Sequence, residues 1–362
     1  MLTVMELKAQ AARLGFDLCG VAPAAGFPEL RFLREWIDRG YAGEMGYMGR
    51  TADRRADVRA VLPSARSVIV TGTVYNTDRA YSTEQADSAT AQVSRYAWGD
   101  DYHEVLDARL DALLGWMRDC AGAPFEARTY VDTGPVQERV YAQHAGLGWI
   151  GKNTCLINDR LGSWVFLSEI ICSLPIEPDP PALDQCGTCT LCLEACPTDA
   201  LVAPWVLDST RCLSYLTIEL KAEVPVPMRA ALGAHVYGCD ICQDVCPWNG
   251  AATLSPAPEW QPRPAFDQPS LVSLWQRSDA DLRQQLKGSA MRRAGARRLR
   301  RNLAVALGNS GDPRAVDALE TTSADHAMVS DPLVAEHVRW ARARLRAPQR
   351  STAASRRPSA SS

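Results

Sequence analysis

Eight cysteines between residues 186 and 246 constrain this chain more than any other feature of its sequence. A first run, C-x2-C-x2-C-x3-C-P, begins at Cys186, and a second run, C-x2-C-x3-C-P, ends at Pro247. Such spacing is typical of modules with two [4Fe–4S] clusters, in which the fourth cysteine of a run binds the other cluster. The runs supply seven thiolates, and Cys212 is the remaining cysteine of the interval. Crossed ligation predicts two ligand sets: Cys186, Cys189, Cys192 and Cys246 for one cluster, and Cys196, Cys212, Cys239 and Cys242 for the other.

Disulfide bonds and structural zinc are the alternatives for these cysteines. Disulfides are typical of secreted chains, but residues 1–20 carry Glu6, Lys8 and Arg13 where a secretion signal needs an unbroken apolar stretch. Zinc binds C-x2-C pairs, but it does not explain two runs that both end in Cys-Pro. The sequence therefore favours iron–sulfur clusters. The other four cysteines have apolar neighbours and are predicted to be small buried hydrophobes: Cys19, Cys120, Cys155 and Cys172.

Length and charge limit the remaining possibilities. A chain of 362 residues is long enough for two or three domains, each with its own core. The net charge of −3 excludes a globally basic nucleic-acid binder, so any nucleic-acid surface must be local. No apolar run reaches the roughly 18 residues of a membrane span, and no twin-arginine signal lies at the N-terminus. We expect a cytoplasmic protein without a membrane partner, where twelve cysteines stay reduced.

Two proline-rich stretches, residues 175–181 and 256–269, are predicted to be linkers. They divide the chain into an α/β domain over residues 1–178, a cluster module over 179–252, a helical domain over 268–346 and a disordered tail over 347–362. Within the helical part, residues 302–318 and 333–345 have the pattern of helix pairs in a small α-solenoid.

Hydrophobic periodicity predicts the main elements of the first part. Helices are expected over residues 3–14 and 28–39 and after His103, and strands over residues 17–22 and 67–75. Residues 154–158 and 163–171 are strand-like and joined by a short turn, which predicts a hairpin and an antiparallel component in a mixed or antiparallel sheet. The glycine-rich loop 40–49 has two interpretations, a close approach of backbone to a ligand or to other backbone, and an ordinary surface turn.

Residues 130–135, Tyr-Val-Asp-Thr-Gly-Pro, predict a strand that ends and turns into a helix with Pro135 at its first position. Asp132 at this junction has two interpretations, a carboxylate that does chemistry and a carboxylate that caps the helix. A G-x-G-x-x-G sequence begins at Gly146, but a helical pattern precedes it and a strand pattern follows it. Dinucleotide-binding folds have the opposite order, so this motif does not predict nicotinamide binding.

A basic segment follows the second linker. Residues 283–301 contain eight lysines and arginines and no acidic residue. Helical spacing places four of these arginines on one face: Arg293, Arg297, Arg300 and Arg301. A solvated charged face is one interpretation, but the missing acids favour a surface that binds phosphates.

Together these motifs resemble the epoxyqueuosine reductase family, whose members are cobalamin-dependent iron–sulfur enzymes that complete queuosine in tRNA. The resemblance covers roughly residues 5–310. It is carried by the cysteine runs and by residues 100–103, 131–135, 145–153, 212–219 and 237–249. It implies an N-terminal α/β domain that holds cobalamin, a ferredoxin-like module with two [4Fe–4S] clusters, and an all-α, HEAT-like C-terminal domain for tRNA.

The resemblance also implies a reaction. Epoxyqueuosine at the wobble position of tRNA would be reduced to queuosine, with the epoxide oxygen lost as water. Two electrons would reach cob(I)alamin through the clusters from an external low-potential donor of ferredoxin or flavodoxin type. Asp132 matches the family's proton donor, which must protonate the developing alkoxide. A monomer is expected.

Individual contacts follow from the same resemblance. Segments that surround cobalamin in similar proteins contain Arg55, Arg95, Asp132, Lys152, Asn153 and Ser214. The implied tRNA contacts are Lys221, Arg293, Arg297, Arg300 and Arg301. The Asp-x-His-x-x-Gly motif, which gives cobalt a histidine ligand, begins at Asp101 but has Leu106 in place of its glycine. We therefore expect a base-off cofactor without a histidine from the protein.

Two other classes of protein share part of this pattern. Reductive dehalogenases also pair cobalamin with two clusters, but they usually carry a twin-arginine signal and have no use for a basic helical segment. A non-enzymatic electron carrier would use the cluster module alone and leave roughly half of the chain without a role.

Overall fold

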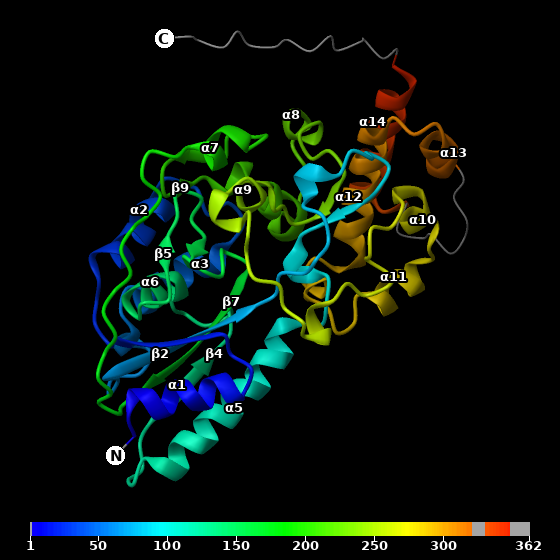
Figure 1. Cartoon of the computed structure of the whole chain (residues 1–362). Helices are drawn as coiled ribbons and strands as arrows, with labels where there is room; N and C mark the ends of the chain where they lie inside the picture. Colours follow the sequence, from blue (N-terminus) through cyan, green and yellow to red (C-terminus); the bar gives the residue numbers. More distant parts are fainter. Residues whose placement is uncertain (1, 321–329, 348–362) are drawn as a thin grey trace.

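The computed structural model describes residues 2–320 and 330–347 (Figure 1). Its central element is a four-stranded sheet in which all neighbouring strands are antiparallel. In sheet order the strands are β1 (Leu18–Pro23), β2 (Ser67–Val74), β7 (Val165–Cys172) and β4 (Ala127–Tyr130). Every residue of β2 is buried, which agrees with its continuous β-branched sequence. The antiparallel component expected from the sequence is confirmed.

Helices cover both faces of this sheet. The helices concerned are α1 (Val4–Arg13), α5 (Tyr102–Cys120) and α6 (Glu138–His144). α1 and α5 lie on one face, where Leu110 and Ile170 share an apolar cluster. α6 packs on the other face, where Val140 and Ile171 share a second cluster. The sheet therefore has apolar contacts on both sides.

The predicted hairpin is wrong in its pairing. β6 (Leu156–Ile157) pairs with β5 (Trp149–Ile150), whereas β7 pairs with β2 and β4. Within the described residues, Asn158 and Gly162 form the one bridge across the intervening turn. The turn closes locally, but the long apolar β7 buries both of its faces only when it lies inside the main sheet.

The helix after Asp132 begins later than predicted. Residues 131–137 form turns, and Pro135 therefore lies before the first residue of α6. Gln137 is the N-cap of α6, and its side chain makes no capping hydrogen bond. The capping interpretation of Asp132 is wrong. The G-x-G-x-x-G sequence, residues 146–151, contains β5 and lies between α6 and β6. A helix therefore precedes it and a strand follows it, which is the order that the sequence indicated.

The segment before β2 contains short helices, and the predicted helix over residues 28–39 is split in two. Its elements are the 3-10 turns Pro28–Arg31 and Val58–Ala60 and the helices α2 (Phe32–Asp38), α3 (Gly46–Arg50) and α4 (Ala52–Arg55). Gly43, in the glycine-rich loop, has a φ of +53°, and an added Cβ would lie 2.3 Å from the hydroxyl of Tyr215. This close approach is to a side chain of the same protein.

The cluster module consists of short elements around the cysteine runs. They are α7 (Leu191–Ala195), β8 (Leu201–Ala203), β9 (Val206–Leu207), a π-helical turn (Tyr215–Glu219), α8 (Val226–Arg229), β10 (His235–Tyr237) and α9 (Ile241–Asp244). Other short elements are β3 (Gln92–Val93) and the 3-10 turns Ser82–Glu84, Arg95–Ala97, Ser209–Arg211, Pro247–Asn249, Pro258–Trp260 and Ala290–Arg293.

The described residues after 270 are helical. They form α10 (Leu271–Gln276), α11 (Asp279–Gln285), α12 (Gly295–Ser310), α13 (Arg314–Glu320) and α14 (Pro332–Arg346). α12 packs along α14, as Figure 1 shows. None of the helices in residues 2–320 and 330–347 is long and apolar enough to cross a bilayer. The predicted tail lies outside the described residues, apart from Ala347.

One apolar core joins all three predicted parts of the chain. β3 of the first part pairs in parallel with β10 of the cluster module. Val93, Val236 and Leu303 belong to the same buried cluster, so α12 packs directly on this strand pair. The helical part therefore shares an apolar core with the other two parts, and the predicted domain boundaries stay a prediction.

Candidate functional site

The eight predicted cluster ligands form two groups in space. The first group, Cys186, Cys189, Cys192 and Cys246, lines one cavity. The second group is Cys196, Cys212, Cys239 and Cys242, whose thiols lie close enough to affect one another's ionisation. These are the two sets that crossed ligation predicts. Each offers four thiols, which is the donor set of a [4Fe–4S] cluster.

All twelve cysteines lie within the described residues, and all have free thiols. Cys172 is buried, whereas Cys19 and Cys155 are partly buried. Cys120 is exposed near the end of α5, so the prediction that it is a buried hydrophobe is wrong. The thiol of Cys155 forms a hydrogen bond with that of Cys242, beside the second ligand group.

Lys152 and Asn153 lie against the cluster loops. The ammonium group of Lys152 donates to the carbonyl oxygens of Gly187, at 2.7 Å, and Cys189, at 2.9 Å. The side-chain amide of Asn153 donates to the carbonyl oxygen of Cys242, at 3.2 Å. Both residues are buried, and both line the first cluster cavity. Both residues therefore support the cysteine runs, and their contact with cobalamin stays a prediction.

Ser214 also lies beside a predicted cluster ligand, Cys212. Its backbone N–H donates to the thiol of Cys212, and its hydroxyl group bonds to the same thiol. Hydrogen bonds to a ligand sulfur are one of the means by which a protein tunes a cluster's potential. Contact between Ser214 and cobalamin stays a prediction.

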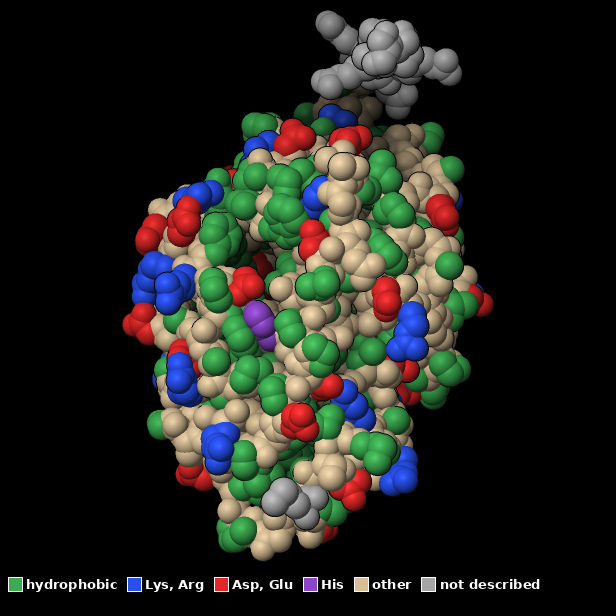
Figure 2. All heavy atoms as spheres, turned by 60° about the vertical axis from the view of Figure 1, so that its left-hand side comes forward, with side chains coloured by type: hydrophobic (Ala, Val, Ile, Leu, Met, Phe, Trp, Pro, Cys, Tyr) green, Lys and Arg blue, Asp and Glu red, His purple; other side chains and the backbone are tan. Residues whose placement is uncertain are grey.

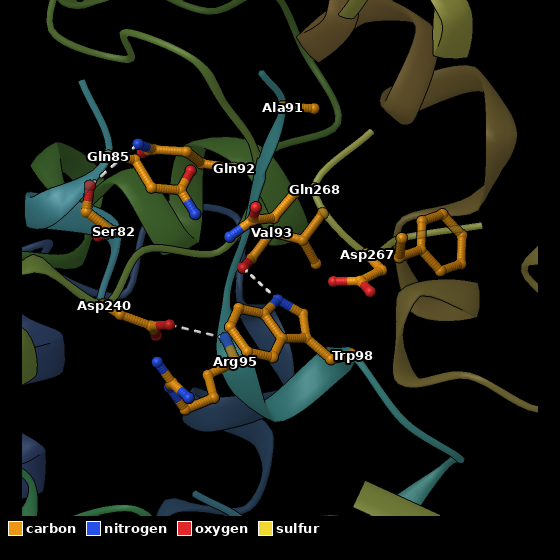
Figure 3. Close-up of a pocket in the computed structure, with 11 residues that line it drawn as sticks. Ser82, Gln85, Ala91, Gln92, Val93, Arg95, Trp98, Asp240, Asp267 and Gln268 are labelled. Atoms are coloured by element: carbon orange, nitrogen blue, oxygen red, sulfur yellow. Dashed lines mark hydrogen bonds between the residues drawn. The ribbon is translucent and has the colours of Figure 1, made fainter. Parts of the chain in front are cut away.

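Arg95 is enclosed within the protein and is 3% exposed. Its guanidinium donates to the carbonyl oxygens of Thr77, at 2.9 Å, and Arg79, at 2.8 Å. Its backbone N–H donates to the carboxylate of Asp240 at 2.7 Å, and Figure 3 shows Arg95 beside Asp240 and Trp98 in a small pocket. Arg95 therefore fixes the loop that follows β2, and its contact with cobalamin stays a prediction.

Asp132 lies in the turn that follows β4, with a backbone φ of 56°. Few residues other than glycine adopt this left-handed conformation, and such residues often mark functional sites. The side chain of Asp132 is 53% exposed, so a bulky substrate can reach it. The hydroxyl group of Tyr102 donates to its carboxylate, and Arg293 adds a nearby positive charge.

His103 links Asp132 to a second carboxylate. Its Nε2 lies 3.4 Å from Oδ2 of Asp132, and its Nδ1 lies 2.7 Å from Oδ1 of Asp101. Asp101 is the N-cap of α5 and accepts the backbone N–H of His103, so the start of the helix fixes the imidazole ring. Both ring nitrogens of His103 therefore face carboxylates.

Burial and mutual contacts set the charges of these groups. Burial lowers the pKa of His103, but hydrogen bonds to Asp101 and Asp132 outweigh it and raise this pKa to about 9. Partial shielding of the Asp132 carboxylate from water raises its pKa, but the contacts with His103 outweigh this effect, so the pKa lies below its ordinary value. At neutral pH the proton that this pair shares is therefore on His103.

Two further carboxyl groups lie behind Asp132, and the sequence analysis missed both. Glu138 is the first residue of α6, and its carboxyl group accepts the backbone N–H of Asp132. Glu169 is fully buried in β7, where it pairs in register with Tyr130 of β4. Burial raises the pKa of Glu138 to about 8 and the pKa of Glu169 well above its ordinary value. A lone acid inside an apolar strand was the available signal for Glu169.

Arg55 is the other predicted cofactor residue that lies at this site. Its guanidinium donates to the carbonyl oxygen of Val136, at 2.7 Å, and to the hydroxyl group of Thr51, at 3.0 Å. It is near enough to Glu138 and Glu169 to lower the pKa of each. Arg55 therefore partly balances the negative charge around Asp132.

The exposed part of the basic segment is smaller than predicted. Arg293 and Arg297 are about half exposed, and each pairs with an acid from elsewhere in the chain. These acids are Glu219, at 2.6 Å from Arg293, and Asp331, at 2.9 Å from Arg297. Lys221 is exposed. Although the segment itself contains no acidic residue, part of its positive charge is neutralised by acids from other parts of the chain.

Arg300 and Arg301 are fully buried, and the prediction that they contact tRNA phosphates is wrong. Arg300 forms an ion pair with Asp279 at 3.0 Å. Arg301 donates to the carbonyl oxygens of Leu216, Leu220 and Ala222, at 2.5 to 2.8 Å. α12 is enclosed on several sides, so its basic side chains point into the protein as well as out of it.

Figure 2 shows one face of the molecule with a hollow. Hydrophobic side chains surround much of this hollow, acidic side chains lie at its edge, and a histidine is close by. Most basic side chains in this view lie toward the outer edge. A mostly apolar concavity with a few polar groups is typical of sites for small molecules and cofactors.

Comparisons with known proteins agree with this arrangement. Residues 55–133 match the family model described as epoxyqueuosine reductase QueG, DUF1730, and residues 185–249 match the 4Fe-4S double cluster binding domain. The epoxyqueuosine reductase of Xanthomonas campestris pv. campestris is 40% identical over 341 residues, which cover 93% of this chain and 94% of that protein. The corresponding protein of Gloeobacter violaceus is 44% identical over 317 residues, with coverages of 86% and 97%.

A solved structure is similar over nearly the whole fold. It is a crystal structure of epoxyqueuosine reductase with an epoxyqueuosine-modified tRNA-Tyr stem loop. Its TM-score is 0.83 at 31% identity, and the match covers 94% of this chain and 89% of that one. With its double-cluster domain and its full-length relatives, this chain belongs to the epoxyqueuosine reductase family and is an enzyme of that type.

Proposed function

We propose that this protein reduces epoxyqueuosine to queuosine at the wobble position of tRNA, the last step of queuosine formation. The observation that carries the proposal is the linked series Asp101, His103 and Asp132, which places a proton beside an exposed carboxylate. Opening an epoxide develops negative charge on oxygen, and a positioned acid is the group that such a step requires. The similarity to a reductase bound to a modified stem loop supports tRNA as the substrate.

The reaction removes one oxygen atom and leaves an alkene. Both C–O bonds of the epoxide break, two electrons and two protons enter, and one molecule of water leaves. The two cysteine sets supply places for two one-electron carriers. An external low-potential donor would refill them, and we propose a cytoplasmic monomer that takes electrons from a ferredoxin or flavodoxin.

Asp132 is the proposed donor of the first proton. The carboxylate is ionised at neutral pH, because its contacts with His103 and Arg293 lower its pKa despite burial. His103, whose pKa is about 9, holds a proton next to it. The proton would pass from His103 through Asp132 to the developing alkoxide, and Asp101 would keep the imidazole ring in place.

Cobalamin is the proposed cofactor, by resemblance to the family. Of the residues assigned to it, Arg55 and Asp132 lie at the open site, and the glycine-rich loop 40–49 leads into α3 nearby. The paired nitrogens of His103 suit a cofactor that needs no histidine ligand. When bound, cobalamin would supply a strongly reducing metal centre for C–O cleavage.

The proposed tRNA surface consists of Lys221, Arg293 and Arg297 on and around the start of α12. Replacing Lys221 and Arg297 together with alanine is expected to weaken tRNA binding and to reduce the salt slope by about one unit per lost contact. The ion pair between Arg297 and Asp331 is exposed and worth only about 0–1 kcal/mol, so a phosphate can replace it. Titrations of modified stem loop at several salt concentrations give the slope.

Arg314→Ala is the matched control for this surface. Arg314 is also exposed and also pairs with an aspartate, but it lies on α13, outside the proposed surface. The Arg314→Ala substitution should leave the tRNA affinity and its salt slope unchanged. If the salt slope of the double variant is unchanged, Lys221 and Arg297 do not contact tRNA phosphates and are only solvated surface charges.

His103→Gln tests the proton held beside Asp132. A histidine whose pKa rises from 6.5 to about 9 on folding adds stability that is complete below pH 6.5 and is lost as pH rises through 9. The difference in unfolding free energy between parent and variant should therefore shrink from pH 6.5 to pH 9. Denaturant titrations at several pH values measure it, and a difference that stays constant would place no extra proton on His103.

The activity itself is tested by nucleoside analysis. Protein reconstituted with iron, sulfide and cobalamin, and reduced chemically, is incubated with tRNA that carries epoxyqueuosine. We expect the epoxide nucleoside to be replaced by queuosine, which has one oxygen fewer. Modified tRNA that stays unchanged with fully loaded and reduced protein would contradict the proposed function.

A further inference from the structure

Glu169 is a fully buried carboxyl group without a partner. Among the described residues, neither of its carboxyl oxygens accepts or donates a hydrogen bond. Its side chain lies on the face of the sheet that α6 covers, because it pairs in register with Val70 of β2 and Tyr130 of β4. Both of these neighbours belong to the apolar cluster on that face.

An ionised carboxylate in such a place is very unfavourable unless a cation or several donors stabilise it. The charged groups that act on Glu169 are Glu138 from α6, Asp132 from the turn after β4, and Arg55 from α4. Glu138 and Asp132 raise the pKa of Glu169 and Arg55 lowers it, but burial has the largest effect. Glu169 is therefore a neutral carboxylic acid at neutral pH, in keeping with its raised pKa.

Glu138 interacts with both Glu169 and the exposed Asp132. Its carboxyl group accepts the backbone N–H of Asp132, and it interacts electrostatically with both Asp132 and Glu169. The charged groups that face it are Asp132, Arg139 and Arg55. Three carboxyl groups from β7, α6 and the turn after β4 thus converge from the buried core to the exposed site.

We propose that Glu138 and Glu169 store the second proton of the reaction and deliver it through Asp132 after the first has been used. The inference rests on the proposed function, because that reaction consumes two protons. The first proton leaves the pair of His103 and Asp132 for the alkoxide. The second passes from the pair of Glu138 and Glu169 to the oxygen as it departs, which yields water and leaves one carboxylate to be reprotonated from solvent.

Infrared difference spectroscopy tests the stored proton without any turnover. The spectrum of the parent protein minus that of Glu169→Gln should contain the carbonyl band of a protonated carboxylic acid. Glu126→Gln is the matched control, because Glu126 is exposed and lies next to β4. It should give only the bands of an ionised carboxylate. The same carboxylate bands for Glu169 would overturn the proposal.

Single-turnover kinetics with pre-reduced enzyme test the delivery. Glutamine matches the shape of a neutral acid but holds no transferable proton. Glu169→Gln should therefore keep its iron, its fold and its tRNA affinity. Its rate of queuosine formation should fall by up to about tenfold, and its solvent isotope effect should be larger. A direct proton donor contributes roughly 10²–10⁴-fold, and a group one step removed should contribute less.

The outcomes separate this inference from the proposed function. A parent enzyme that converts the tRNA, together with a Glu169→Gln variant of equal rate, would overturn the proton store and leave the function intact. A parent enzyme that leaves the epoxide unchanged would contradict both, whatever the infrared band. If Glu169→Gln does not fold, Glu138→Gln carries the same expectations for the band and the rate.

Discussion

Asp132→Asn is expected to slow the single-turnover conversion of modified tRNA by about a hundredfold or more, the low end of the range for a general acid. Asparagine has nearly the same size and tolerates the left-handed backbone at this position, where φ is 56°. It hydrogen bonds to His103, but it cannot pass a proton. Because Gln137, and not Asp132, occupies the N-cap position of α6, the substitution should leave the helix unchanged.

Pre-reduced enzyme is the right material for this measurement, because it separates proton delivery from the supply of electrons. The variant should keep its iron, its cobalamin and its tRNA affinity. Asp159→Asn, an exposed aspartate in the turn between β6 and β7, is a matched control and should react at the parent rate. A rate for Asp132→Asn within about threefold of the parent would mean that another group donates the proton.

Cys212→Ala is expected to remove one cluster and spare the other. The parent should bind about eight irons per chain, and the variant about four, because two cubes of four irons share eight thiolates. The spared cluster is the one whose ligands line a cavity of their own, Cys186, Cys189, Cys192 and Cys246. Iron analysis and electron paramagnetic resonance of anaerobic protein measure both quantities.

Cys155→Ala is the sharpest control for this prediction. The Cys155 thiol forms a hydrogen bond with the Cys242 thiol. Cys155 therefore lies beside the second predicted ligand set without belonging to it. The Cys155→Ala variant should keep about eight irons per chain. Full iron retention in Cys212→Ala together with iron loss in Cys155→Ala would exchange the two cysteines in the ligand set.

The grouping of the eight cysteines into two sets could be predicted because their information is local. The spacing within each run determines which thiols can reach one cluster. The two runs supply seven of the eight thiols required, and Cys212 is the one other cysteine in the interval. α1 and α5 were also predictable, because apolar residues recur at helical spacing along a single buried face. Asp132 was located correctly, but its helix was placed too early since turn residues 131–137 have no periodicity to count.

The errors arose where tertiary contacts decide. Arg300 and Arg301 have the sequence of an exposed basic face, yet α12 is enclosed by α10, α14 and the cluster module. Glu219 and Asp331 approach the remaining arginines from distant parts of the chain. Glu169 was passed over within an apolar strand, and its role depends on neighbours from three separate elements. A single sequence does not specify such contacts.

The buried hydrogen bonds of Arg301 and Asn302 have a consequence for how the protein is made. Arg301 donates to carbonyl oxygens within residues 216–222, which follow Cys212. Asn302 donates to the carbonyl oxygen of Thr217 in the same segment and to that of Val236, which precedes Cys239. The ribosome releases these cysteines well before it releases α12. The backbone next to two predicted ligands of the second cluster therefore gains these hydrogen bonds only after the C-terminal helices have emerged. We expect insertion of that cluster to follow translation of nearly the whole chain.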